Sequence, residues 1–493
     1  MQKIKKNNLI FLIALAAFTI VAFFYRLYGL IANYSFWTDE EHVAIFARNI
    51  LEKGKPVLLN NYSTGFYQWL QYWLAAFSAR IFGLNEFAIR FPSIVFGVLT
   101  IWAVYFLGKE LFNKRVALLA SFFITFLKIE ILWSRQARPY QALQFFFILG
   151  AYFLYKIVKA KKINRNYFLG FLICGILASL MHGLGIFLFV GGLFYLLIMK
   201  LSWLKERCFL GLLAILALTI SSYFLKDKIV STLDKFTEFN NFYYYRVFLK
   251  HNYLLISFLF FLGLLVMLLK GKFKQIALFA IFVGIQFALV SWFLPQPFTR
   301  YFYIIFPFII LPASYFLWFV SKFFKNKFLS LICLLFLVFL TVWISKDKFA
   351  ILPQRIYSLN EDMQEIPEVD WKVIYGFVEN KLNQDENIVL VTNWTDLPVW
   401  FLGEGKLNYL IRKDYMAQTD SFTNAEVIHD LTELKEMIKE EKSGLLVLDS
   451  WDDYVPDGVR EYAAGNLKKE LEVDRLYPKQ PRLWPVQIYS WGI

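Results

Sequence analysis

Apolar residues occur in long runs along the first 345 residues of the chain, and polar residues gather in short stretches between these runs. Most runs extend over about 17–21 residues, which is long enough for a helix to cross a hydrocarbon layer of roughly 30 Å. The pattern therefore predicts about eleven membrane spans. They cover approximately residues 9–25, 91–111, 116–133, 139–157, 166–181, 183–199, 208–225, 252–269, 275–294, 301–320 and 328–345.

The first connection that is predicted to lie outside, residues 26–90, is itself rich in apolar and aromatic residues. Its segment 66–83 reads FYQWLQYWLAAFSARIFG, and Arg80 is the only charged residue within it. This composition is typical of a helix that lies in the membrane interface or re-enters the membrane. A long ordered loop in a compact domain is usually functional, so we expect the loop to contribute to a site.

The pattern changes after residue 345, where short helical and strand-like segments alternate. Residues 370–382 and 425–442 are predicted to be helices, and residues 387–393, 406–411 and 444–450 are predicted to be strands. This order predicts a small α/β domain with a partly parallel sheet. The expected fold is thus an α-helical polytopic membrane domain, residues 1–345, with interfacial helices in its first outer loop, followed by a soluble α/β domain, residues 346–493.

Composition and charge support this division. The chain is 58% hydrophobic and 20% aromatic, well above the apolar share of ordinary soluble domains. Residues 1–345 contain 35 Lys+Arg and 11 Asp+Glu, a net charge of +24, whereas residues 346–493 contain 17 and 27, a net charge of −10. The overall charge of +14 therefore belongs to the membrane part, and we predict no nucleic-acid partner.

The positive charges also predict the orientation in the membrane. If the N-terminus is cytoplasmic, the six segments that face the cytoplasm hold 20 Lys+Arg and only two acids, Glu110 and Glu206. This distribution satisfies the positive-inside rule. We therefore expect a multi-pass plasma-membrane protein in which residues 26–90, residues 226–251 and the C-terminal domain are extracytoplasmic.

Three consecutive acids follow the first predicted span, in SFWTDEEHVAIFARNIL. Thr38 is a favourable N-cap, and Glu41 three residues later completes a capping box on the more polar side of the helix. Asp39 and Glu40 instead head the apolar side, which should press against the helix bundle or the bilayer. A carboxylate there is costly unless it is paired or used, so Asp39 and Glu40 are candidate catalytic residues.

Three motifs in the membrane domain carry a family resemblance. FWTDEEHVAIFA resembles the first-outer-loop acidic motif of the protein O-mannosyltransferase-like superfamily of membrane glycosyltransferases, which have the GT-C fold. The segment RFPSIVFGVLTIWAVYFLGKELFNKRVALLASFF with the later SRQARPYQ, and the segment PFTRYFYIIFPFI, are similar to further segments of that family. The resemblance implies inverting transfer of a sugar from a polyprenyl-phosphate carrier to an acceptor hydroxyl at the outer membrane face.

The resemblance also implies roles for individual residues. Asp39 would be the base that takes the acceptor's proton, and Glu40 would position Asp39 or the acceptor. Arg135, Arg138 and Arg300, at the predicted outer ends of spans, would bind the lipid phosphate with their forked donors. An arginine at this depth also snorkels to lipid headgroups in many membrane proteins, which is the alternative for all three.

Four further residues are candidate substrate contacts, each with a structural alternative. Tyr140 and His182 lie at the same predicted depth as these arginines, at the outer ends of spans. Aromatic-belt tyrosines and interfacial histidines are also common at this depth. Glu130 would contact substrate or form an ion pair with a nearby arginine. His42 follows the three acids directly.

The acids of the first outer loop and the three cysteines are the possible ligands of a metal cofactor. Some proteins of the wider fold use a divalent ion, for which the acids and His42 offer ligands, but we predict no obligatory cofactor. Cys174, Cys208 and Cys333 show no metal-binding spacing. The expected partners are a polyprenyl-phosphate sugar and a protein, lipid or glycan acceptor. The alternatives are a transporter or flippase of lipid-linked sugars and a non-catalytic membrane scaffold with an outer binding domain.

Overall fold

The computed structural model describes residues 2–30, 35–36, 38–58, 68–162, 164–201, 240–294, 297–355, 369–474 and 484–493. They form two compact units. The first contains Met1–Tyr28, Phe66–Leu70 and Ser93–Asp362. The second contains Gly29–Gly65, Gln71–Pro92 and Met363–Ile493, so it combines most of the first outer loop with the C-terminal part of the chain.

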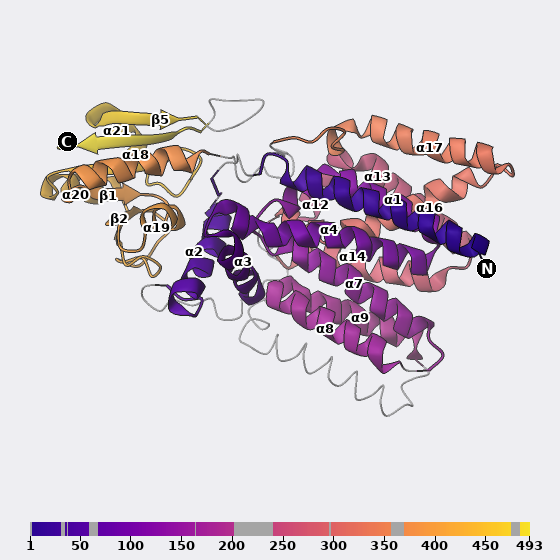
Figure 1. The fold of residues 1–493 in the computed structure, drawn as a ribbon. Helices are drawn as coiled ribbons and strands as arrows, with labels where there is room; N and C mark the ends of the chain where they lie inside the picture. Colours follow the sequence, from indigo (N-terminus) through magenta and orange to yellow (C-terminus); the bar gives the residue numbers. More distant parts are fainter. Residues whose placement is uncertain are drawn as a thin grey trace. The chain divides into compact units, whose positions relative to one another are not determined.

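The first unit is helical, and its long apolar helices run along one another (Figure 1). Five of the described helices are long and apolar enough to cross a membrane, or six if the bent pair α12–α13 forms one span. The protein is a multi-pass membrane protein. Its helices are α1 Gln2–Leu27, α5 Lys114–Phe126, α6 Lys128–Ser134, α7 Tyr140–Lys159, α8 Arg165–Met181, α9 Ile186–Met199, α12 Phe242–Asn252, α13 Leu254–Leu269, α14 Phe273–Trp292, α15 Thr299–Tyr303, α16 Phe306–Ser321 and α17 Lys327–Ile344, together with the part of α4 Glu86–Leu111 that follows Pro92.

Most predicted spans coincide with these helices, but two are broken. The predicted span 116–133 is divided into α5 and α6 at Leu127, whose backbone is extended (φ −68°, ψ 123°). Leu127 forms an isolated bridge with Phe349, and the Ala350 N–H donates to the Phe126 carbonyl at 2.8 Å. The predicted span 301–320 is likewise divided into α15 and α16. The predicted span 208–225 lies outside the described residues.

The helices of this unit pack closely where small residues meet. Gly263 of α13 lies so close to α16 that a Cβ atom there would be 2.1 Å from the Pro312 carbonyl oxygen. Since that distance is far below any real contact, a side chain at position 263 would force the two helices apart. The outward face of α17, by contrast, exposes large apolar side chains such as Phe336 and Phe339, as expected of a surface in contact with lipid.

The second unit contains a six-stranded sheet in the order β3-β2-β1-β4-β6-β5. Strands β1 to β4 pair in parallel, whereas β6 is antiparallel to both β4 and β5. The elements of its C-terminal part are α18 Trp371–Gln384, β1 Val389–Thr392, α19 Asp396–Leu402, β2 Tyr409–Ile411, β3 Glu426–Ile428, α20 Leu431–Glu440, β4 Gly444–Asp449, α21 Val459–Asn466, β5 Lys468–Val473 and β6 Val486–Trp491. The first outer loop adds α2 Thr38–Lys53 and most of α3 Trp69–Phe82 to this unit.

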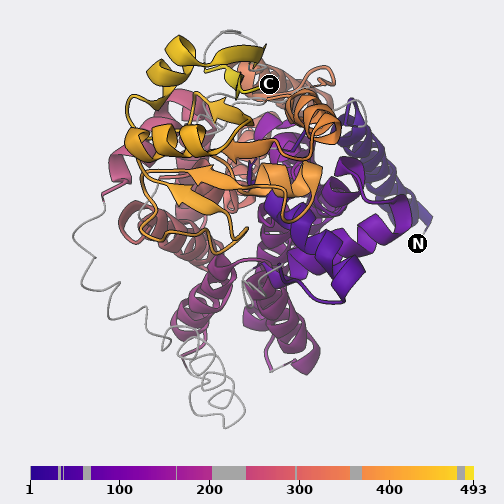
Figure 2. The ribbon, with the colours of Figure 1, turned by 90° about the vertical axis from the view of Figure 1, so that its left-hand side faces the viewer.

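Helices cover both faces of this sheet (Figure 2). Alternate residues of β4 point to opposite faces: Leu445 packs with α18 and α19, and Leu446 packs with α20 and α21. The predicted α/β domain is therefore confirmed. The helix predicted over 425–442 is partly wrong, because its first residues form the short strand β3, which pairs with β2.

Candidate functional site

The three consecutive acids occupy the first turn of α2 (Thr38–Lys53), in the second unit. Asp39 is half-buried, whereas Glu40 and Glu41 have no exposed surface. Carboxylates in the first turn of a helix are favoured by its dipole, but this effect does not require burial. Of the three acids, only Asp39 keeps a surface that another molecule can reach.

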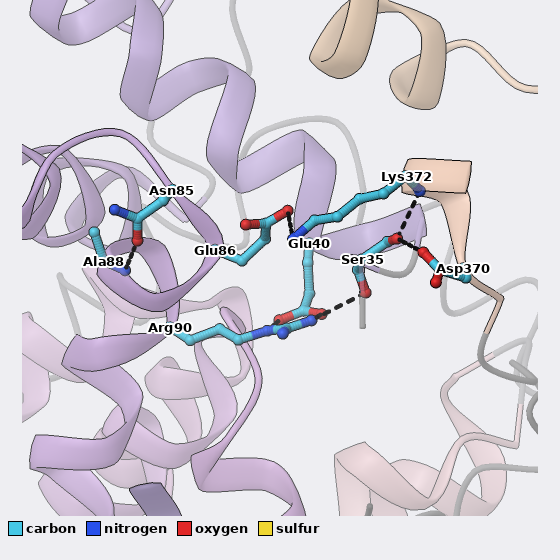
Figure 3. Close-up of polar contacts among 8 residues, drawn as sticks. All are labelled: Ser35, Glu40, Asn85, Glu86, Ala88, Arg90, Asp370 and Lys372. Atoms are coloured by element: carbon cyan, nitrogen blue, oxygen red, sulfur yellow. Dashed lines mark hydrogen bonds and ion pairs between the residues drawn. The ribbon is translucent and has the colours of Figure 1, made fainter. Parts of the chain in front are cut away.

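Glu40 is paired with Arg90 near the start of α4 (Figure 3). The Arg90 Nε donates to Glu40 Oε1 at 2.8 Å, and a terminal nitrogen donates to Oε2 at 2.6 Å. The same arginine donates to the Ser35 carbonyl at 3.3 Å and lies 5.1 Å from the centre of the Phe36 ring. This bidentate, buried geometry fixes the Glu40 carboxylate firmly to Arg90, and the part of Glu40 in the reaction remains a prediction.

Glu41 corrects one expectation from the sequence. We expected it on the wetted side of the helix as half of a capping box, but it is fully buried. Among the described residues, neither of its carboxylate oxygens has a hydrogen-bond partner. The capping interaction expected of the Thr38 side chain lies outside the described residues. Burial raises the pKa of Glu41 well above its usual range, and the nearby Glu40 and Asp396 carboxylates add to the rise.

This burial predicts a pH-dependent stability. The folded protein retains the Glu41 proton while the unfolded chain loses it near pH 4.3, so stability falls as the pH rises above that value toward the raised pKa. Glu41→Gln cannot ionise, so it should be more stable than wild type at pH 7.5. Each kcal/mol gained in the free energy of unfolding should raise the melting temperature by about 2–4 °C, and the gain should be smaller at pH 4.5. Thermal unfolding at both pH values measures this, with Glu379→Gln on the exposed face of α18 as control. A variant less stable than wild type at both values would show that the native carboxylate is charged and paired.

The side of α2 that carries Arg48 packs against α19 of the C-terminal part of the chain. The apolar side, headed by Asp39 and Glu40, contributes Phe46, whose ring stacks on the Tyr72 ring at 4.8 Å. The Arg48 guanidinium donates to the carbonyls of Val399 (3.1 Å) and Trp400 (3.4 Å). One turn further on, the Lys53 ammonium forms an ion pair with Glu404 at 2.9 Å. The helix that carries the acids is thereby fixed to α19 and to the segment directly after it.

His42 lies between aromatic rings and one carboxylate of the second unit. Its ring centre is 4.8 Å from that of Phe46 and 5.7 Å from that of Phe422, against which it stacks. Its Nδ1 is 3.9 Å from Asp396 Oδ1. Among the described residues, no three His, Cys, Asp or Glu side chains are grouped as a metal site requires.

Four of the predicted site residues meet in the first unit. The Tyr140 ring, at the start of α7, lies 5.4 Å from the His182 ring and 5.5 Å from the Arg138 guanidinium. The Arg300 guanidinium lies 5.6 Å from the Tyr301 ring, which in turn is 6.2 Å from His182. Both arginines are close enough to His182 to act on its charge. Two cations, a histidine and two tyrosines therefore form one group, which we call the cation–aromatic cluster.

Local structure fixes the orientation of His182. It follows the last residue of α8, and its Nδ1 accepts the Leu184 N–H at 3.1 Å. Because Nδ1 is the acceptor, a neutral ring must carry its proton on Nε2. Burial of the ring favours the neutral form, and the charges of Arg138 and Arg300 favour it further. The ring thus presents an N–H donor in addition to the donors of the two guanidinium groups.

Arg135 has different contacts from Arg138, although they share one turn. One terminal nitrogen donates to the carbonyls of Tyr28 (2.8 Å) and Gln354 (3.1 Å), and the other donates to the carbonyl of Arg355 (2.7 Å). These bonds join the end of α1 to the segment after α17. Such contacts are those of a structural cross-link, so phosphate binding by Arg135 remains a prediction.

Glu130 is fully buried on α6 and is hydrogen-bonded. The Tyr303 hydroxyl lies 2.8 Å from its Oε2, and the Gln144 amide donates to its Oε1 at 3.0 Å. Arg26, at the end of α1, is also fully buried and contributes a favourable charge. An arginine near Glu130 was expected from the sequence, and that arginine is Arg26. It lies in none of the three motifs that carry the family resemblance. A basic residue within an otherwise apolar run was the available signal.

Part of the chain matches a family model and a curated protein. A family model described as "dolichyl-phosphate-mannose-protein mannosyltransferase" matches residues 69–225. An uncharacterized protein of Aquifex aeolicus strain VF5 is 28% identical over 289 residues, which cover 54% of this chain and 56% of that protein. The chain thus matches little more than half the length of that relative.

Two solved structures are similar over nearly the whole chain. ArnT from Cupriavidus metallidurans, bound to undecaprenyl phosphate, aligns over 97% of both chains with a TM-score of 0.64 and 13% identity. The oligosaccharyltransferase AglB from Archaeoglobus fulgidus, in complex with an inhibitory peptide and a dolichol-phosphate, aligns over 89% of this chain and 69% of its own, with a TM-score of 0.56 and 12% identity.

This chain has the GT-C fold. The resemblance that the three sequence motifs indicated is thereby confirmed, as is the predicted arrangement of apolar helices followed by a small sheet domain. The family match and the GT-C fold together support a glycosyltransferase. In this GT-C chain the cation–aromatic cluster belongs to the first unit, and the acidic turn of α2 belongs to the second.

Proposed function

We propose that this protein transfers a sugar from a polyprenyl-phosphate-linked donor to an acceptor hydroxyl at the outer face of the plasma membrane, with inversion at the anomeric carbon. The observation that carries the proposal is the cation–aromatic cluster. Two guanidinium groups and a histidine N–H at the ends of apolar helices offer donors to a phosphate, and tyrosine rings beside them suit a sugar. The two similar structures were solved with lipid phosphates bound.

The position of the cluster at the start of α7 adds to its affinity for an anion. The N-terminal end of a helix carries a partial positive charge, and α7 has 20 residues. Arg138 immediately precedes this end, and Tyr140 is its first residue. A phosphate bound here is stabilised by the guanidinium charges and by the helix dipole together.

The reaction needs one base and one displacement. We propose that Asp39 takes the proton of the acceptor hydroxyl as the acceptor oxygen bonds to the anomeric carbon. The bond from this carbon to the phosphate oxygen breaks at the same time, and the lipid phosphate leaves with the electron pair. Attack opposite to the leaving group inverts the configuration. Arg138 and Arg300 stabilise the charge that develops on the phosphate.

The orientation in the membrane completes the proposal. The distribution of lysine and arginine supports an N-terminus in the cytoplasm and an acidic C-terminal domain outside. The acceptor is a protein, lipid or glycan, and the C-terminal domain helps bind or orient it. A transporter of lipid-linked sugars would also bind lipid phosphate, but it would have no use for a base on α2.

Lipid-phosphate binding tests the role of the arginines. Arg138→Lys and Arg300→Lys keep the charge but lose the forked donors, so each should weaken binding of undecaprenyl phosphate by roughly 10–100-fold, the equivalent of one or two lost charged hydrogen bonds. Titration of the purified protein with this lipid measures the change. Arg165→Lys, at an exposed position at the start of α8, is the control. Unchanged binding by both cluster variants would contradict the proposed phosphate site.

A further inference from the structure

A hydrogen-bond network lies among the elements that carry the cation–aromatic cluster. It contains Glu130 of α6, Gln141 and Gln144 of α7, and Tyr303 of α15, and all four side chains are buried. The Tyr303 hydroxyl is within hydrogen-bond distance of Glu130 Oε2 (2.8 Å), Gln141 Oε1 (2.5 Å) and Gln144 Oε1 (3.1 Å). Every member contacts at least two others, so we call this set the buried network.

Each element that supplies the buried network also supplies or leads to a residue of the cation–aromatic cluster. Helix α6 ends at Ser134 and leads into the turn that contains Arg138. Gln141 and Gln144 lie in the first turns of α7, next to Tyr140. Tyr303 is three residues after Arg300 on α15, which is about one helical turn.

Further contacts strengthen the connection between these elements. The Gln144 amide donates to the Tyr303 carbonyl at 3.1 Å, so α7 holds the backbone of α15 as well as its side chain. The Trp133 ring lies 5.5 Å from the Tyr140 ring and 6.0 Å from the Tyr303 ring, between the cluster and the network. The Ser93 hydroxyl donates to the Arg138 carbonyl at 3.3 Å and fixes the turn.

We propose that the buried network positions Arg138 and Arg300 for the donor phosphate, and that Glu130 and Tyr303 are its central pair. The inference rests on the proposed function. Elements α6 and α15 are both short, with 7 and 5 residues, and each arises from a break in a span that the sequence predicted to be continuous. Segments this short have little helical stability of their own. The network supplies the contacts that fix their relative placement.

The chemistry of the network explains why its loss would lower the affinity for the phosphate. Buried polar groups without a partner cost free energy, so removal of one member leaves several others to find new partners. The forked donors of an arginine bind phosphate only within a narrow range of distances and angles. A small shift of α15 relative to α7 therefore weakens phosphate binding even when the fold is kept.

Tyr303→Phe is the direct test, and Tyr155→Phe is its matched control. Tyr155 lies on α7, as Gln141 and Gln144 do, and accepts a hydrogen bond from Gln275 at 3.0 Å. It is 15 residues from Tyr140, which is about 22 Å along the helix. Both variants lose one buried tyrosine hydroxyl and should lower the melting temperature to a similar extent. Only Tyr303→Phe should weaken the binding of undecaprenyl phosphate, by about tenfold.

Glu130→Gln separates positioning from catalysis. Glutamine has the same size and can hydrogen-bond to Tyr303 and Gln144, so this variant should bind undecaprenyl phosphate within about threefold of wild type and retain sugar transfer. Glu130→Ala should lose affinity as Tyr303→Phe does. Loss of transfer in Glu130→Gln with normal lipid binding would make Glu130 a catalytic carboxylate and overturn the proposal.

Lipid binding by these variants and by wild type separates the positioning role of the network from the proposed function. If Tyr303→Phe does not fold, Gln144→Leu replaces it, because it removes the bonds to Glu130 and to the Tyr303 carbonyl. Equal binding by wild type and by these variants would overturn the positioning role and leave the proposed function intact. A wild-type protein that does not bind undecaprenyl phosphate would instead overturn both.

Discussion

Asp39→Asn should abolish sugar transfer while leaving the fold and donor binding intact. Asparagine has the same shape as aspartate but cannot accept the proton of the acceptor hydroxyl, and the loss of a general base lowers rates by about 10²–10⁴-fold. Asp39 is the half-buried acid of the three, whereas Glu40 and Glu41 are fully buried. Because a phosphate site built on Arg138 and Arg300 does not use Asp39, the affinity for undecaprenyl phosphate should not change.

Mass spectrometry of glycans and lipid-linked sugars measures this effect before the acceptor is known. Cells that express wild type should contain a sugar-modified product that is absent from cells with the Asn variant, which should instead accumulate the lipid-linked sugar. Asp453→Asn, at an exposed position of the C-terminal domain, controls for the loss of one acid. A transporter or a scaffold would behave alike with Asp and Asn at position 39. Normal product formation by the Asn variant would contradict the role of Asp39 as base.

The sequence predicted the membrane helices well because their signal is local. A run of apolar residues identifies a span without reference to the rest of the chain. The break between α5 and α6 was missed for the opposite reason: Leu127 is held in an extended conformation by Phe349, far along the chain. The strand β3 was read as helix because its three residues gain their structure from pairing with β2. Hydropathy and periodicity carry no information about such partners.

The same distinction applies to the candidate site. Arg138, Arg300, Tyr140 and His182 were predicted from their level in the membrane, and the structure brings them together. The burial of Glu41 was missed, because helical periodicity shows which residues share a face but not which faces another segment will cover. The helix α19, which packs against α2, lies in the C-terminal part of the chain.

The pairing of Glu40 with Arg90 could not be predicted either, and it gives the largest expected effect on stability. Removal of one partner of a buried ion pair leaves the other charge without compensation, which typically costs about 3–5 kcal/mol. Both side chains are at most 6% exposed, so solvent gives little relief. Arg90→Met should therefore lower the melting temperature by many degrees or prevent folding. Thermal unfolding of the purified full-length chain and its yield measure this loss.

Lys372→Met is the matched control, because Lys372 forms an ion pair with Glu86 at 3.0 Å but is 48% exposed. Exposed pairs contribute about 0–1 kcal/mol, so this variant should melt close to wild type.

The double variant Glu40→Met with Arg90→Met then separates structure from catalysis. Two apolar side chains of similar volume leave no buried charge, so the double variant should regain most of the stability that Arg90→Met loses. If Glu40 acts only by positioning α2, the double variant should also regain sugar transfer, because Asp39 is unchanged and its helix is again held in place. Restored stability without restored transfer would assign Glu40 a direct part in the reaction. A single Arg90→Met variant as stable as wild type would show that Glu40 does not depend on this arginine.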